Sequence, residues 1–302
     1  MQSNYFSGIP AAACPMPERI LPKGTLVAKQ YEVIGAPYGG KCKALYHCKS
    51  NKMFGRDVML AVPFADGEGC VLPFKNEQNV LENISHPGII KMLHSGECQK
   101  YGLFTAYEII DAPTLAAAVR QERRLELERA VSIFVQTCAA LAHLHKNNLV
   151  HGSLKANHIL LPRLKDHETV KLIDLAQAQP PGRTRQFGAP ELIDLFQTVG
   201  HPSPEELRGE TIDQRADIYA LGCMLYKILT GKAPFNGSSA EEIKQKHIEE
   251  APPSLLSAFP QVSFPMQLEE CVKRMLAKKP EDRHQSADDL ALDLRFAARR
   301  SG

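Results

Sequence analysis

Hydrophobic and polar positions alternate along the first third of the chain, as half-buried β-strands require. Glycine, proline and asparagine separate these apolar runs and indicate turns. A short helix is predicted over residues 74–84, between the third and fourth runs, because its apolar side chains recur at helical spacing. The five predicted strands are residues 31–36, 43–48, 57–62, 89–93 and 102–107.

After residue 115 the apolar positions recur every three or four residues, which is typical of helices that bury one face. Residues 217–229 are apolar almost all round, so we expect this helix at the centre of its lobe. Ser286 and Asp289 form a predicted capping box at the start of the last helix. Strands followed by helices indicate an α+β fold with two lobes. The predicted units are a flexible, proline-containing leader (1–28), a strand-rich N-lobe (29–110) and a helical C-lobe (111–298).

Composition limits the function classes open to this chain of 302 residues. Its net charge is +2, and its lysines and arginines are scattered, which argues against a nucleic-acid or membrane surface. No uncharged apolar stretch is long enough to cross a bilayer, and no signal peptide is recognisable. The eight cysteines form no Cys-x-x-Cys pair and show no zinc-site spacing with histidine. We therefore expect reduced thiols in a cytoplasmic protein.

Eight short motifs follow one another along the chain. They are His86–Ile90, Glu108–Asp111, His151–Leu161, Asp174–Ala176, Ala189–Glu191, Asp217–Gly222, Leu229–Phe235 and Arg283. In this order they resemble the motifs of the protein kinase family. Within that family they are most similar to those of bacterial Ser/Thr kinases. The resemblance covers residues 31 to about 298. It implies a small N-lobe of five antiparallel strands with one helix, and a larger, mainly helical C-lobe.

The resemblance also implies the contacts that hold such a fold together. Glu191 and Arg283 match the buried ion pair between the family's Ala-Pro-Glu segment and the helical lobe. Asp217 matches the residue that ties the central helix to the catalytic loop, which begins at His151. An activation segment from Asp174 to Glu191 is short, and a longer connection over residues 192–210 follows it.

The lysine that holds phosphate in the family is replaced. Pro63 stands at its position on the third strand, while Glu77 keeps the position of the helix glutamate that pairs with it. Lys43, or Lys41 as a second candidate, could reach the site from the neighbouring strand, as in the with-no-lysine kinases. The alternative is that both are solvated loop lysines.

The catalytic loop keeps its frame but changes its chemistry. Ser153 stands at the position of the catalytic aspartate, and a serine hydroxyl does not act as a base without a neighbour to take its proton. His158 replaces the metal-binding asparagine, where a local hydrogen bond is the expected role because magnesium prefers oxygen ligands. Asp174 is retained, either as one metal ligand or as a carboxylate that pairs with a nearby cation or caps backbone amides. Lys155 keeps the position that contacts phosphate, or is a surface lysine.

A nucleotide site would use residues from both lobes. Gly39 and Gly40 are what remains of the family's glycine loop, and an ordinary hairpin turn is the favoured interpretation. Tyr107 falls at the back of the adenine pocket, where its ring either narrows the cavity or completes the core. The candidate nucleotide residues are Gly39, Gly40, Lys43, Ala61, Glu77, Tyr107, Glu108, Ile109, Lys155 and Asp174, and the candidate metal ligands are Asp174 and His158.

We expect no catalytic residue in the usual sense, since Ser153 and Pro63 occupy the base and lysine positions. The predicted function is that of a pseudokinase, a catalytically impaired kinase-like domain that binds an unidentified protein partner. The alternatives are an atypical Ser/Thr kinase or an ATP-binding sensor that uses Lys43 and Asp174. No cofactor is required by the first hypothesis, whereas the alternatives use ATP, with or without magnesium.

Overall fold

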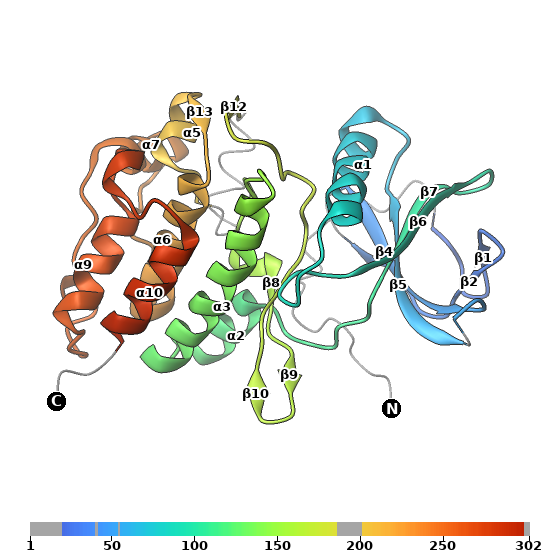
Figure 1. Ribbon diagram of the computed structural model, residues 1–302, viewed down its shortest axis with the longest axis horizontal. Coiled ribbons are helices and arrows are strands. Elements are labelled where there is room, and N and C mark those ends of the chain that lie inside the picture. Colours follow the sequence, from blue (N-terminus) through green and yellow to red (C-terminus); the bar gives the residue numbers. More distant parts are fainter. Residues whose placement is uncertain (1–19, 40–41, 54, 186–200, 299–302) are drawn as a thin grey trace.

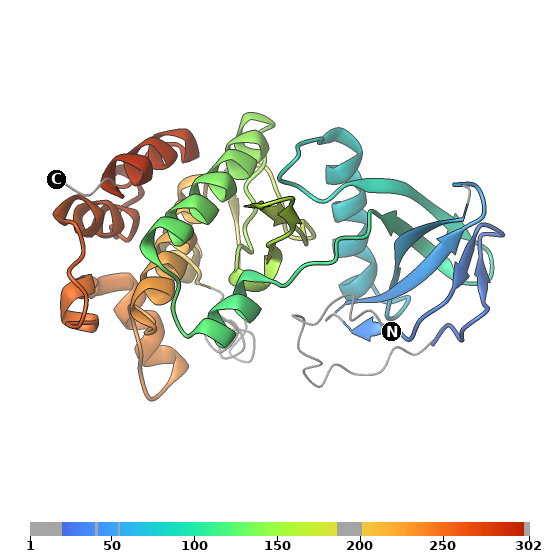
Figure 2. The same ribbon diagram turned by 90° about the horizontal axis from the view of Figure 1, so that it is seen from below.

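Two lobes make up the computed structural model, which describes residues 20–39, 42–53, 55–185 and 201–298. A β-sheet with one helix forms the N-lobe, and helices dominate the C-lobe (Figure 1). The extended chain between β7 (Gly102–Tyr107) and α2 (Leu115–Glu122) joins the two lobes (Figure 2). The predicted α+β class and the two-lobed arrangement are confirmed.

The N-lobe sheet is antiparallel, with the order β1-β2-β4-β5-β7-β6, and β3 pairs with β4 beside this path. Alternate residues of β5 enter two different cores, Val58, Leu60 and Val62 on one face and Met59 and Ala61 on the other. This two-sided burial explains the continuous apolar run of that strand. The strands are β1 (Leu26–Val27), β2 (Tyr31–Val33), β3 (Tyr38–Gly39), β4 (Lys43–Ser50), β5 (Arg56–Pro63), β6 (Met92–Cys98) and β7 (Gly102–Tyr107).

The sheet begins earlier than the sequence predicts. β1 lies within the expected leader, and the buried Leu21 donates its backbone N–H to the Tyr46 hydroxyl at 3.1 Å. The expected strand at 89–93 is displaced to β6, because Ile89 instead forms a parallel bridge with Leu172 of the C-lobe. The N-lobe therefore includes residues that precede the expected boundary at residue 29.

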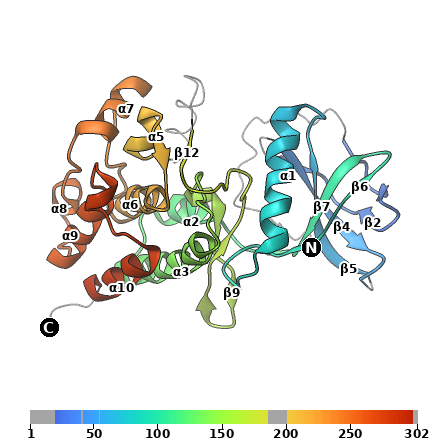
Figure 3. The ribbon, with the colours of Figure 1, turned by 45° about the horizontal axis from the view of Figure 1, so that its top comes forward.

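Helix α1 (Glu68–Asn83) lies on the side of the sheet that faces the C-lobe (Figure 3). It starts six residues before the expected helix and carries Pro73 inside. Proline there removes one N–H from the helical hydrogen bonds and crowds the preceding turn, yet the helix runs on to Asn83. Phe74, Glu77 and Leu81 are among its buried residues, and these face the sheet and the C-lobe.

The C-lobe is organised around α6 (Arg215–Thr230), whose residues are almost all buried. The long α3 (Leu127–Lys146) packs against α6 and α10 (Ala287–Ala297), and α9 (Met266–Met275) also packs against both (Figures 1 and 3). Ser286 accepts a hydrogen bond from the Asp289 N–H at 3.0 Å and caps α10. None of the helices that the structure describes combines the length and apolar character that crossing a membrane requires. The remaining elements are η1 (Ala156–His158), β8 (Ile159–Leu160), β9 (Arg163–Leu164), β10 (His167–Glu168), β11 (Lys171–Leu172), β12 (Arg183–Thr184), α5 (Pro204–Arg208), β13 (Thr211–Ile212), α7 (Ala240–Glu249), α8 (Leu255–Ala258), α9 (Met266–Met275), η2 (Pro280–Asp282) and α10 (Ala287–Ala297).

The predicted pairing of Arg283 with Glu191 is wrong. The fully buried Arg283 guanidinium forms a two-pronged ion pair with Glu205, both contacts being 2.7 Å. It also donates to three backbone carbonyls, so its hydrogen-bonding capacity is used within the C-lobe. Glu191 lies outside the described residues. The Ser203-Pro204-Glu205 segment therefore takes the place assigned to Ala-Pro-Glu, and the activation segment extends from Asp174 to Glu205.

Replacing Glu205 with glutamine should lower the free energy of unfolding by about 3–5 kcal/mol, because it leaves a buried guanidinium without its counter-charge. Chemical denaturation measures this change. Glu210→Gln is the matched control, since that carboxylate is 55% exposed and pairs only loosely with Arg208. Equal losses in the two variants would contradict the assignment of the pair.

Candidate functional site

Lys43 takes over the place of the missing lysine. It lies directly across from Pro63 in the β4–β5 register. Its ammonium group donates to the carboxylate of Glu77, which is 1% exposed. The solvated-lysine interpretation is therefore wrong for Lys43, whose side chain is 20% exposed and paired. Lys41, the second candidate, lies outside the described residues.

Glu77 is the centre of this contact. It also accepts hydrogen bonds from the Tyr107 hydroxyl at 2.9 Å and from the Leu175 N–H at 3.2 Å. Asn76, one residue earlier on α1, donates to the carbonyls of Ala176 and Ala178 at 3.0 and 2.8 Å. Helix α1 is thereby fixed to the segment that follows Asp174.

Electrostatics keep the Lys43 side chain charged. Burial by itself would lower the pKa of Lys43, but Glu77, with smaller contributions from Tyr107 and Asp174, raises it above the ordinary value. Burial also raises the pKa of the Tyr107 phenol, which therefore stays a hydrogen-bond donor. A fixed positive charge thus faces the junction of the two lobes.

Asp174 contacts two side chains, although its own side chain is 38% exposed. His158 Nε2 lies 3.1 Å from one carboxylate oxygen, and Lys43 Nζ lies 3.9 Å from the other. Burial would raise the pKa of Asp174, but His158 and Lys43 outweigh it and hold the pKa well below the usual range. The backbone φ of Asp174 is +63°, an uncommon value for a residue with a side chain, and such values occur at functional sites.

Asp217 of the central helix α6 holds the catalytic loop in position. Asp217 accepts hydrogen bonds from the backbone N–H groups of His151 and Gly152, at 2.9 and 3.0 Å. The same carboxylate lies 2.9 Å from His145 Nε2. The His151 ring stacks on His158 with a centroid separation of 6.0 Å. Asp217 thus sets the position of the loop that presents Ser153 and His158.

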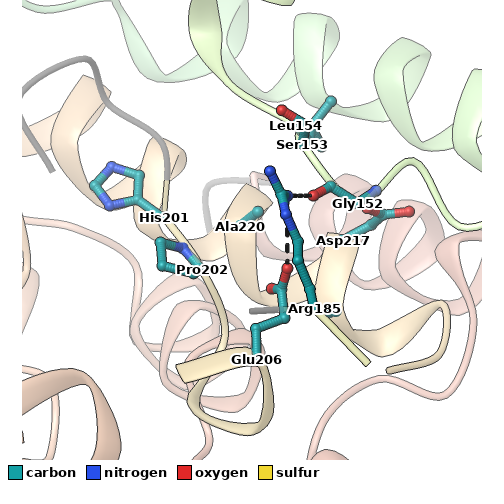
Figure 4. Close-up of a pocket in the computed structure, with 10 residues that line it drawn as sticks. Gly152, Ser153, Leu154, Arg185, His201, Pro202, Glu206, Asp217 and Ala220 are labelled. Atoms are coloured by element: carbon teal, nitrogen blue, oxygen red, sulfur yellow. Dashed lines mark hydrogen bonds and ion pairs between the residues drawn. The ribbon is translucent and has the colours of Figure 1, made fainter. Parts of the chain in front are cut away.

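An arginine of the activation segment occupies the place beside Ser153 (Figure 4). Arg185 donates to the Gly152 carbonyl, and its guanidinium lies 4.0 Å from Glu206. These residues line a cavity of about 20 Å³, which is room for roughly one water molecule. Burial raises the pKa of Glu206 to about 7 despite hydrogen bonds from Ser203 and the charge of Arg185. Arg185 therefore contacts the backbone of the catalytic loop at Gly152, next to Ser153.

Comparisons with known proteins agree with this geometry. The family model described as protein kinase domain matches residues 29–292. This chain is a member of the protein kinase family. It is 30% identical over 271 residues to the serine/threonine-protein kinase PknB of Mycolicibacterium smegmatis, covering 87% of this chain and 41% of that protein. It is 30% identical over 278 residues to pkn3 of Myxococcus xanthus, covering 90% and 50%.

A further relative is the serine/threonine-protein kinase PrkC of Bacillus subtilis, 27% identical over 277 residues. That alignment covers 91% of this chain and 41% of PrkC. The chain therefore spans half or less of the length of these curated relatives. The match shows the protein kinase family, and the activity in each relative's name is stated of that relative alone.

The other candidate residues have mixed placements in this kinase-family site. Gly39 pairs with Ala44 in the sheet, and Gly40 lies outside the described residues. Ala61 is fully buried on β5. Glu108 accepts from the Lys91 N–H at 2.9 Å and from the Lys171 ammonium group, so its side chain braces the inter-lobe segment, in which Ile109 is partly buried. Lys155 is close enough to Asp174 to help lower its pKa.

Three functional residues escaped the sequence prediction: Arg185, Glu205 and Glu206. A local signal existed for one of them, Glu206. Ser203 and Glu206 form a reciprocal capping box at the start of α5, and the Ser-x-x-Glu pattern is visible in the sequence. Arg185 has no such signal, because its contacts come from the fold of the activation segment.

The buried His151 predicts a pH dependence of stability. Burial lowers the pKa of His151 to about 4, with Asp217 opposing the shift. Histidine in an unfolded chain titrates near 6.5, so the unfolded state takes up the proton first as the pH falls. The free energy of unfolding should therefore drop between pH 6.5 and pH 4 by about 3 kcal/mol from this group.

Urea denaturation across that pH range measures the effect. His151→Phe, which removes the titrating ring, should show a shallower pH slope than the wild type. His167→Gln is the control, since His167 is exposed on the short strand β10. Identical slopes in wild type and His151→Phe would refute the assignment.

Proposed function

We propose that this protein kinase-family domain is impaired in phosphoryl transfer and acts by binding another protein. The observation that carries the proposal is the contact between His158 and Asp174. It places an imidazole where transfer requires an oxygen-coordinated metal ion. Ser153 stands at the position of the catalytic base, and Pro63 stands at the position of the strand lysine. The altered positions are therefore those that handle phosphate.

Magnesium does not fit this arrangement. It requires near-octahedral oxygen coordination, and one of the two family positions offers only nitrogen. The other, Asp174, already has its oxygens directed at His158 and Lys43. ATP fits better, because the charged Lys43 faces the junction between the lobes and could neutralise phosphate.

The rate penalty supports impairment. Loss of a general base commonly costs ~10² to 10⁴ in rate. Ser153 itself stands at the position of the family's aspartate, and Arg185 lines the same cavity beside it. The residues that hold the scaffold together remain, including Asp217 and Arg283 with their buried partners. A protein-binding role needs that scaffold and does not need turnover.

Exposed apolar side chains support a protein partner. Met266 is 72% exposed and Phe296 61% exposed, and both line one groove on the C-lobe. Large apolar groups that gather at one surface favour binding to another protein. The groove lies far from the Lys43 cluster, on helices α9 and α10 at the other end of the molecule (Figure 1).

Radiolabelled ATP tests the impairment. The purified chain with magnesium and a general protein substrate should transfer phosphate at least ~10⁴-fold more slowly than the 1–100 per second typical of the family, about the loss that a missing base and an absent metal site produce. Asp174→Ala supplies the background. Vigorous magnesium-dependent labelling that disappears in Asp174→Ala would defeat the proposal and favour an atypical kinase.

A second candidate function is an ATP-binding sensor, and the Lys43–Glu77 pair favours it. That pair, together with Asn76, keeps α1 attached to the Asp174 segment. A phosphate group that competes for Lys43 would change the contact that fixes α1. Nucleotide binding would then be converted into a movement of the N-lobe helix that a protein partner could detect.

Thermal stabilisation by ATP distinguishes the two candidates. A sensor should be stabilised by ATP in the presence of a chelator, and Lys43→Met should abolish that shift. Lys49→Met is the matched control, because Lys49 is exposed on the same strand. His158→Asn should make the shift depend on magnesium, since it releases Asp174 and restores an oxygen ligand. The absence of any shift with ATP would eliminate the sensor and leave protein binding.

A further inference from the structure

A thiol, an imidazole and a carboxylate converge in the C-lobe, far from the cluster around Lys43. Cys271 lies on α9, His284 in the loop after η2, and Asp293 on α10. One potential ligand atom from each lies within 4.8 Å of the other two. The sequence showed no zinc-site spacing because the three residues come from three separate elements.

These groups are mostly buried. Cys271 is 2% exposed and His284 is fully buried, while the Asp293 side chain is 38% exposed. His284 Nε2 lies 2.7 Å from Asp293 Oδ2. The Nδ1 atom of His284 is buried and has no hydrogen-bond partner within the described part of the chain. Since Nε2 faces Asp293, it is the nitrogen of His284 that the cluster presents.

We propose that Cys271, His284 and Asp293 form a zinc site that joins α9, the η2–α10 loop and α10. Zinc binds cysteine sulfur at about 2.3 Å and nitrogen or oxygen at about 2.0–2.2 Å, so tetrahedral ligand atoms are about 3–4 Å apart. The largest separation in the cluster needs to close by about 1 Å, which side-chain rotation can provide. Binding replaces the thiol proton of Cys271 by the metal and releases that proton to solvent.

The set of donors selects the metal class. Sulfur and imidazole together suit zinc, whereas magnesium and calcium favour all-oxygen sites. Three protein ligands leave the fourth tetrahedral position to water or to a further group. A groove of about 560 Å³ borders both Cys271 and Asp293 and provides the access route. Its lining includes the carboxylates of Glu270 and Asp282 as well as the cations Lys273 and Arg274.

Two other interpretations fit less well. A nucleophilic Cys-His pair needs a sulfur that a substrate can reach, but the Cys271 side chain is only 2% exposed. Simple core packing explains a buried cysteine but does not explain why a thiol, an imidazole nitrogen and a carboxylate oxygen converge within 4.8 Å of one another. The site also lies next to Arg283 in the sequence, so a metal there would brace the loop that presents the buried ion pair to Glu205.

Metal retention by the purified full chain tests the proposal. After treatment with a chelator and return to a slight excess of zinc chloride, the dialysed protein should retain one zinc per chain by elemental analysis. Cobalt in place of zinc should give a near-ultraviolet absorption from charge transfer between the Cys271 thiolate and cobalt. Less than a tenth of an equivalent of retained zinc, or cobalt binding without that absorption, would overturn the site.

Variants assign the ligands. Cys271→Ser should abolish the thiolate absorption, and Asp293→Asn should weaken zinc binding at least tenfold in competition with a chromophoric chelator. Cys98→Ser and Asp289→Asn are matched controls, the first a half-buried thiol in the N-lobe and the second an acid one helical turn before Asp293. If Cys271→Ser fails to fold, the cobalt spectrum of the wild type and the affinity of Asp293→Asn still decide. The proposal would be refuted if Asp293→Asn bound zinc as tightly as the wild type does and the cobalt-loaded wild type lacked the thiolate absorption.

Discussion

A buried carboxylate must have a counter-charge, and Glu77 sets this requirement for the whole junction between the lobes. It is 1% exposed, and an uncompensated charge in such a place would cost several kcal/mol. Pro63 removes the family's lysine from β5, but the register of the sheet puts Lys43 of β4 directly opposite. The ion pair is therefore re-formed from the neighbouring strand. Because Glu77 also accepts the Leu175 N–H, the same contact positions the segment that carries Asp174.

The second carboxylate is compensated in the same way. In an active family member, metal ions neutralise the charges that meet between the lobes. Here His158 and Lys43 are the groups next to Asp174, and Lys43 is shared with Glu77. Both carboxylates thus face the Lys43 cation, and the His158 ring adds a 3.1 Å contact to Asp174. These side-chain contacts join β4, α1 and the segment around Asp174, and the proposed binding role needs that scaffold.

Local patterns predicted much of the fold. The continuous apolar run of β5, the all-round apolar helix α6 and the cap of α10 each depend on neighbours in the sequence, and all three were recognisable. The arrangement around Lys43 was predicted only as an alternative, because strand register decides which lysine reaches Glu77. Ion pairs between residues far apart in the sequence could not be predicted from local patterns. Arg283 binds a glutamate 78 residues away, and a three-residue motif match selected Glu191 instead of Glu205. The Cys271 cluster depends on three packed elements, so spacing rules cannot detect it.

The position of a divalent ion in crystals of the nucleotide-bound chain tests the central claim most directly. Manganese can be located by its anomalous scattering after soaking with ATP. The account predicts no manganese beside Asp174, with His158 still in contact with its carboxylate and Lys43 near Glu77. A manganese ion coordinated by Asp174 and the phosphates, with His158 turned away, would contradict it.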